Sequence, residues 1–266
     1  MLYHLNERTL TIGNTRMDTI TFGSGPKPLV MIQGLNTRPI KGAGPSLALL
    51  YRPFAREFTV YLFDRKADLP EAVTVRDLAR DVALAMDSLG LKQACVLGVS
   101  QGGMMAQYLA IDRPDLVEKL VLAVTLSRSN ETVETVIHRW TALTRAGRWK
   151  TLVTDMAESM YSDGYLKRYR PLLPLLTHLQ KPKDVPRFLT LAKACLTCDT
   201  HQDLDKIQCP VLVIGGALDQ VVGGDASREL AAKLGCRLHL YPDLGHAAYE
   251  EAKDFNRLVY DFFMAL

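Results

Sequence analysis

Short, nearly continuous apolar runs recur along the first half of the chain and again in its last quarter. They predict strands at residues 28–32, 58–63, 94–98, 120–124 and 211–214, and a further strand is expected at 237–241. Such runs, without strict alternation, are typical of strands covered on both faces, as in a parallel sheet. Between them, helical spacing of apolar residues predicts helices at about 74–90, 101–111, 226–234 and 250–266. The alternation favours an α/β chain with a mostly parallel central sheet flanked by helices.

Local signals refine two of these segments. Thr74, followed three residues later by Asp77, resembles a capping box, and Gly90 is expected to end the helix that it opens. Residues 1–22 instead show alternating apolar positions with a turn signal at Asn14, which predicts an antiparallel hairpin at the leading edge of the sheet.

Residues 127–200 interrupt the alternation. They contain no strand run, and several helical patterns are divided by glycines and prolines. We therefore expect an all-helical insertion at 127–200 and a core made of residues 1–126 and 201–266. The insertion holds 12 basic and 7 acidic residues, whereas the remainder holds 20 and 22. This excess could steer an anionic substrate, although scattered surface charge that maintains solubility is the simpler interpretation.

Composition narrows the function classes. The 266 residues are 48% hydrophobic and 23% charged, which is typical of a globular protein and not of a disordered or fibrous one. A net charge of +3 argues against a nucleic-acid partner. The chain has no apolar run of the roughly 18 residues that a membrane span needs, and no signal-peptide core follows Met1. Five scattered cysteines favour reduced thiols in the cytoplasm, and the Cys195–Cys198 pair lacks the further ligands of a metal site.

A candidate nucleophile follows the strand predicted at 94–98. The segment Gly98-Val99-Ser100-Gln101-Gly102 matches the GxSxG pattern between a buried strand and a helix, which is the context that the pattern requires. Glycines two residues before and after the serine allow strand and helix to approach closely around a strained turn. The helix that begins at Gln101 directs free N–H groups toward charge that develops beside Ser100.

A serine hydroxyl needs a base, and the base needs an orienting acid. His246 lies in a loop after a late strand, beside Gly245, and Asp219 follows the strand at 211–214 through a glycine-rich turn. Both are therefore expected at the carboxyl edge of the sheet, where such sheets bind ligands. The less favoured alternatives are Asp225 and Asp243 for the acid, and His4, His138, His178, His201 and His239 for the base.

Together these segments resemble the α/β-hydrolase family over nearly the whole chain. The resemblance rests on the Ser100 turn, on Asp219, and on His246 with the closing helix, in the family's chain order of serine, acid and histidine. Residues 127–200 are similar to the family's helical cap. The resemblance also implies an oxyanion hole formed by the backbone N–H groups of Gln101 and Leu35. Gln33 stands where the commonest family pattern has a histidine.

The resemblance implies a serine hydrolase that acts on small or medium-sized carboxylic esters through Ser100, His246 and Asp219, without metal or organic cofactor. A serine at the turn argues against epoxide hydrolases and haloalkane dehalogenases, which use aspartate there. Two alternatives remain: a C–C bond hydrolase or other non-ester activity on the same triad, and a non-catalytic ligand-binding protein of the same fold. A small-molecule ester-like substrate and a monomer or homodimer are expected. The sequence identifies no substrate-binding residues.

Overall fold

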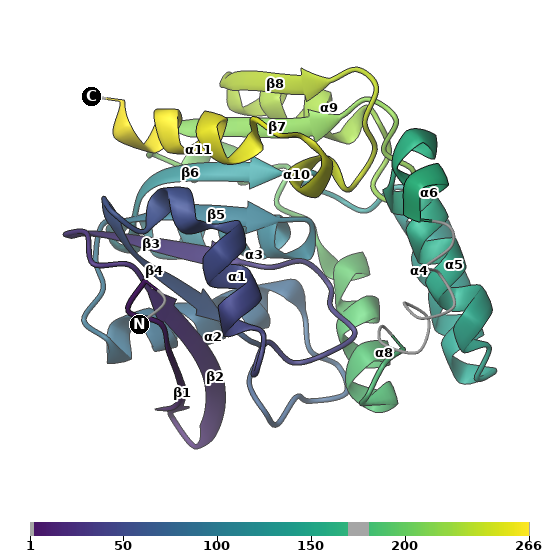
Figure 1. Ribbon diagram of the computed structural model, residues 1–266, viewed down its shortest axis with the longest axis horizontal. Helices are drawn as coiled ribbons and strands as arrows, with labels where there is room; N and C mark the ends of the chain where they lie inside the picture. Colours follow the sequence, from purple (N-terminus) through teal and green to yellow (C-terminus); the bar gives the residue numbers. More distant parts are fainter. Residues whose placement is uncertain (1–2, 170–180, 266) are drawn as a thin grey trace.

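An eight-stranded sheet forms the centre of the protein in a computed structural model that describes residues 3–169 and 181–265 (Figure 1). The strand order is β1-β2-β4-β3-β5-β6-β7-β8. The strands are β1 (Asn6–Ile12), β2 (Thr15–Phe22), β3 (Lys27–Ile32), β4 (Phe58–Phe63), β5 (Ala94–Val99), β6 (Val117–Ala123), β7 (Val211–Gly216) and β8 (Arg237–Tyr241). The predicted α/β class is confirmed, because β3 to β8 pair in parallel and only β1 and β2 are antiparallel to their neighbours.

Helices cover both faces of this sheet. Alternate residues of β3 point into separate cores: Val30 and Ile32 into one, Leu29 and Met31 into the other. The first core packs under α2 (Val75–Ser88), α3 (Gln101–Asp112) and α9 (Ala226–Leu234). The second packs under α1 (Gly44–Leu50) and α11 (Phe255–Met264). Burial of both sheet faces explains why the strands read as continuous apolar runs.

The predicted capping box at the start of α2 is present. The Thr74 side chain accepts a hydrogen bond from the Asp77 N–H, and the Asp77 carboxylate accepts one from the Thr74 N–H.

The closing helix predicted at 250–266 is present as α11, but the prediction of one continuous helix from residue 250 is wrong. The chain forms α10 (Ala248–Glu251), then an extended Ala252 with φ −74° and ψ 116°, and only then α11. The break lets α10 continue from the His246 loop, while Phe255 and Phe263 in α11 are turned into the core beside the sheet.

Helices occupy the chain between β6 and β7. They are α4 (Glu131–Arg145), α5 (Trp149–Met160), α6 (Asp163–Tyr169) and α8 (Val185–Ala194), with 3-10 turns η4 (Cys195–Thr197) and η5 (Leu204–Lys206). The helices α4, α5, α6 and α8 lie beyond the carboxyl ends of the parallel strands (Figure 1). Residues 170–180, which include His178, lie outside the described residues. Within residues 3–169 and 181–265, no helix has the length and apolar character needed to cross a bilayer.

Candidate active site

Ser100 lies on a strained turn between β5 and α3. Its backbone has φ 54° and ψ −120°, outside the regions that side-chain-bearing residues favour. The neighbouring glycines make this turn possible. A Cβ on Gly98 would lie 2.6 Å from the Gly102 carbonyl oxygen, and a Cβ on Gly102 would overlap the carbonyl oxygen of Ile32. The packing of β3, β5 and α3 therefore requires glycine at both positions.

Ser100, His246 and Asp219 form a continuous hydrogen-bonded chain. The distance from His246 Nε2 to Ser100 Oγ is 2.9 Å, and the distance from His246 Nδ1 to Asp219 Oδ2 is 2.8 Å. Because a carboxylate only accepts hydrogen bonds, Nδ1 of a neutral His246 carries the proton and Nε2 accepts from the serine. The His246 and Asp219 side chains are 4% and 2% exposed, so water competes little for this contact.

Two loops at the sheet edge position Asp219 and His246. Asp219 follows β7, and its Oδ1 accepts hydrogen bonds from the N–H groups of Val221 and Val222, at 2.8 and 2.9 Å. The His246 loop follows β8 and runs alongside, with the Leu218 N–H donating to Leu244 O at 3.0 Å. Both Asp219 oxygens therefore have partners, which fixes the carboxylate that faces His246.

Gly34, which precedes Leu35, and Gln101 both adjoin Ser100. A Cβ on Gly34 would lie 3.1 Å from Ser100 Cβ and 3.7 Å from its Oγ, so the loop that leads to Leu35 touches the serine. Gln101 is the first residue of α3, and its N–H has no helical partner. Neither the Leu35 nor the Gln101 N–H donates a hydrogen bond to any other residue that the structure describes. Both N–H groups are therefore candidates for binding a ligand oxygen beside Ser100.

Arg65, which lies just after β4, is part of this neighbourhood. Its Nη2 donates to the carbonyl oxygens of Gln33 and Gly34, at 2.7 and 3.3 Å, and to Gln101 Oε1 at 3.0 Å. Burial lowers the pKa of Arg65 to about 10, against the opposing effect of Asp64, so the side chain stays charged at neutral pH. Its position directly after a strand that ends at the ligand-binding edge was the available signal.

The helices after β6 contact both sides of the site. The side-chain amide of Gln101 donates through Nε2 to Leu191 O in α8, at 2.6 Å. The Ala247 backbone N–H donates to Met160 O at the end of α5, at 2.8 Å. Beside the latter contact, the Tyr161 hydroxyl donates to Glu250 Oε2 at 2.5 Å. Burial and the adjacent Glu250 carboxylate raise the pKa of Tyr161 above its usual value, so this hydroxyl remains a donor. These helices are thereby held against the residues that flank Ser100 and His246.

A cavity of about 220 Å³ adjoins the Ser100 turn. Gly34, Leu35 and Val99 form its wall on the serine side, and Tyr51 and Tyr249 contribute aromatic rings. Most of the lining is apolar, which suits a hydrocarbon group attached to a reacting carbonyl.

The less favoured residues lie elsewhere. Asp225 precedes α9 with a fully exposed side chain that makes no capping hydrogen bond, and Asp243 is exposed. His201 contacts Ser127 Oγ at 3.0 Å, and His239 packs edge-on against Tyr241. Within the described ranges, no group of three or more His, Cys, Asp or Glu side chains could hold a metal ion.

Comparisons with known proteins agree with this architecture. The model of the alpha/beta hydrolase family matches residues 42–258. The protein named "Putative carbamate hydrolase RutD" from a Caulobacter species is 29% identical over 231 residues, covering 83% of this chain and 86% of that protein. The 3-oxoadipate enol-lactonase 2 of Acinetobacter baylyi is 23% identical over 231 residues, covering 83% and 82%.

Solved structures show the same fold. The crystal structure of the enol-lactonase from Burkholderia xenovorans aligns with a TM-score of 0.83 and 21% sequence identity, over 97% of this chain and 100% of that one. An alpha/beta hydrolase enzyme from a deep-sea metagenome library aligns with a TM-score of 0.86 and 20% identity, over 97% and 98%. The expected α/β-hydrolase fold is confirmed.

Proposed function

The chain belongs to the alpha/beta hydrolase family, and we propose that it is a serine hydrolase that cleaves carboxylic esters of small or medium size. The observation that supports this most directly is the chain of short contacts from Ser100 through His246 to Asp219, at 2.9 and 2.8 Å. A base hydrogen-bonded to the nucleophile and an acid hydrogen-bonded to the base are the arrangement that acyl transfer requires.

In the proposed reaction, Ser100 Oγ attacks the ester carbonyl while His246 Nε2 takes its proton. Asp219 holds the imidazole and stabilises its cationic form. The N–H groups of Leu35 and Gln101 bind the oxyanion of the tetrahedral intermediate. His246 then protonates the leaving alcohol, and the acyl group remains on Ser100. A water molecule, deprotonated by His246, attacks this acyl-enzyme and releases the carboxylic acid, so no cofactor is needed.

The apolar cavity supports a restriction on acyl size. Its volume of about 220 Å³ lies below the roughly 300–1,000 Å³ of pockets that bind drug-sized ligands. Because Gly34 and Leu35 belong both to this cavity and to the oxyanion loop, an acyl chain attached to the reacting carbonyl would enter it directly. We therefore propose short acyl chains as the preferred substrates.

The proposal extends to residues 127–200 as a helical cap over the core formed by residues 1–126 and 201–266. Its support is the position of α4, α5, α6 and α8 beyond the carboxyl ends of the strands (Figure 1), together with the contacts to Gln101 and to the His246 loop. A cap in this position would exclude water and provide the remaining walls of the substrate pocket.

Labelling with a fluorophosphonate probe tests the activated serine, and p-nitrophenyl esters of increasing acyl length test the substrate class. We expect stoichiometric labelling that the Ser100→Ala variant abolishes, and the highest kcat/KM for the shortest chains. Labelled protein that leaves every ester and lactone intact but cleaves a vinylogous diketone would replace ester hydrolysis by C–C hydrolysis. A folded wild-type protein that is neither labelled nor active would favour a ligand-binding role instead.

A further inference from the structure

One nitrogen of Arg65 contacts both sides of the candidate oxyanion hole. Nη2 donates to Gly34 O on the loop side and to Gln101 Oε1 on the nucleophile side, and Gln33 O lies at 2.7 Å from the same atom. Arg65 is separated from these residues by more than 30 positions in sequence, and its side chain is buried. Burying the Arg65 charge costs desolvation free energy, even though three acceptors surround its nitrogen. An apolar side chain of similar size would fill the same space without that cost.

The geometry of the peptide unit gives these contacts a consequence. The Gly34 carbonyl and the Leu35 N–H belong to one trans peptide, in which C=O and N–H point in opposite directions. A cation hydrogen-bonded to the carbonyl therefore turns the Leu35 N–H away from itself, and Gly34 packs directly against Ser100. The positive charge also polarises the peptide and strengthens its N–H as a donor.

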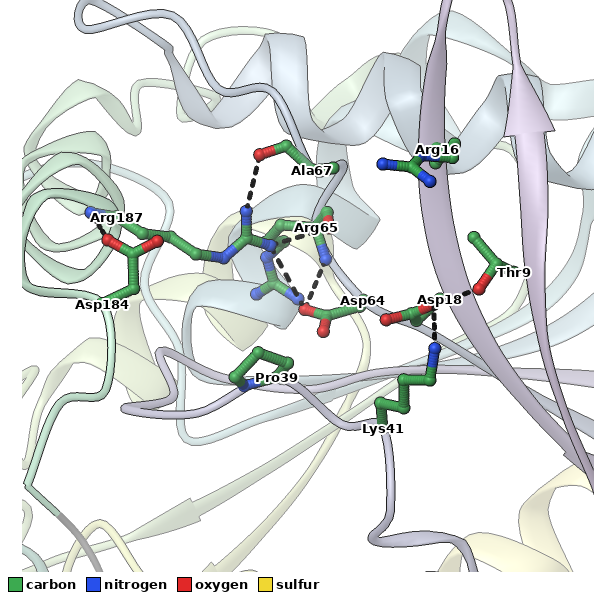
Figure 2. A pocket seen from close by; sticks show the side chains of 10 residues that line it. All are labelled: Thr9, Arg16, Asp18, Pro39, Lys41, Asp64, Arg65, Ala67, Asp184 and Arg187. Atoms are coloured by element: carbon green, nitrogen blue, oxygen red, sulfur yellow. Dashed lines mark hydrogen bonds and ion pairs between the residues drawn. The ribbon is translucent and has the colours of Figure 1, made fainter.

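The loop that holds Arg65 is itself fixed on the side remote from Ser100. Asp64 accepts hydrogen bonds from the N–H groups of Ile40 and Arg65, at 3.0 and 2.7 Å. Arg187 in α8 donates to the carbonyl oxygens of Arg65 and Lys66, both at 2.7 Å. Figure 2 shows Arg187 reaching over Asp64 and Arg65 at the wall of a polar pocket. Two guanidinium groups thus meet at this loop, but only Arg65 reaches the oxyanion residues through its side chain.

We infer that Arg65 is a positioning residue for the oxyanion hole, which orients and polarises the Leu35 N–H and anchors the Gln101 side chain. The inference rests on the proposed function, because it concerns stabilisation of the tetrahedral intermediate at Ser100. It accounts for a charged residue buried next to the reaction centre without contact to the serine, the histidine or the acid.

Arg65→Met removes the charge and the hydrogen bonds while keeping most of the volume, and Arg65→Lys keeps the charge on a single nitrogen. For p-nitrophenyl acetate we expect Arg65→Met to lower kcat about 10- to 100-fold with KM within about threefold. This loss is below the roughly 100- to 1,000-fold that follows removal of an oxyanion donor itself. The rate constant of fluorophosphonate labelling should fall by a similar factor, because the phosphoryl oxygen occupies the same hole. Arg65→Lys should restore part of both rates.

Lys66→Met is the matched control, because it removes a mostly buried positive charge from the same loop, on a side chain that pairs with Asp81 at 3.2 Å and not with an oxyanion residue. Thermal unfolding verifies that each variant is folded. Lys66→Met is expected to lower the unfolding temperature and keep kcat within about threefold. The inference is overturned if folded Arg65→Met and Arg65→Lys proteins keep wild-type kcat and labelling rate, or if Lys66→Met loses kcat equally.

The same measurements separate this inference from the proposed function. If wild-type protein is labelled but cleaves no ester, ester hydrolysis is refuted, and the labelling rates still decide the role of Arg65. If the wild-type protein is not labelled, the serine is not activated, and both proposals fail.

Discussion

Replacement of Asp219 by asparagine tests the proposed base through the orientation of one side chain. In the structure, Oδ1 accepts from the Val221 and Val222 N–H groups, whereas Oδ2 faces His246 Nδ1. An asparagine oxygen can keep the two backbone hydrogen bonds only if its NH₂ group faces His246. The reverse orientation would lose both bonds, at about 1 kcal/mol each, and would point the NH₂ group at two N–H donors.

The asparagine therefore forces His246 into the wrong tautomer. Nδ1 must accept from the NH₂ group, so the proton moves to Nε2, and Nε2 then cannot accept the proton of Ser100. Loss of the correct tautomer in a Ser-His-Asp triad costs about 10⁴-fold in kcat. This corresponds to about 5 kcal/mol of activation free energy, because each tenfold change in rate is about 1.4 kcal/mol.

The assay is kcat for a short-chain p-nitrophenyl ester at pH 7 to 8, with the thermal unfolding temperature measured in parallel. Asp225→Asn and Asp243→Asn are matched controls on exposed carboxylates and should keep wild-type kcat. A folded Asp219→Asn protein with kcat within tenfold of the wild type would refute the reasoning. The same loss in Asp225→Asn or Asp243→Asn, with Asp219→Asn unaffected, would identify another acid.

Two further substitutions test the serine loop and a helix start. Gly34→Ala places a methyl group 3.1 Å from Ser100 Cβ, so the loop must shift by a few tenths of an ångström. We expect kcat to fall about 10- to 100-fold while the unfolding temperature changes little. An unchanged kcat would contradict this expectation. Thr74→Ala should lower the free energy of unfolding by about 1 kcal/mol at pH 7 in urea titrations. Hydrogen bonds from Thr74 lower the pKa of Asp77 below 3.8, so this stabilisation is present above pH 3.8 and is lost as the pH falls through the lowered pKa. A difference between wild type and variant that grows at low pH would oppose this account.

Local signals were sufficient for most strands and for the order of the site residues. The predicted strand at 58–63 matches β4, and the predicted helix at 226–234 matches α9. A strand buried on both faces has a continuous apolar run, and a helix buried on one face has apolar residues at helical spacing, so both patterns can be recognised within a short segment of sequence. Ser100 could be placed for the same reason, since GxSxG concerns only the turn between one strand and the next helix. Asp219 and His246 followed from their positions after strands that share a carboxyl edge.

The closing helix shows where a local pattern misleads. Helical periodicity continued through 250–266, yet Ala252 is extended, because the chain must follow the His246 loop before Phe255 and Phe263 can enter the core. Burial of the Phe255 and Phe263 rings depends on where the sheet lies, which a short window of sequence does not contain.

The sequence alone determined the fold class, the glycine-flanked turn at Ser100 and the chain order of Ser100, Asp219 and His246. These depend on residues close together in the chain or on the common edge of parallel strands. Only the tertiary structure decided that Arg65 meets Gln33, Gly34 and Gln101, and that a small apolar cavity forms beside Gly34 and Val99. Contacts between separate segments depend on how strands pair and helices pack, which fixes distances in space that no spacing in the sequence encodes.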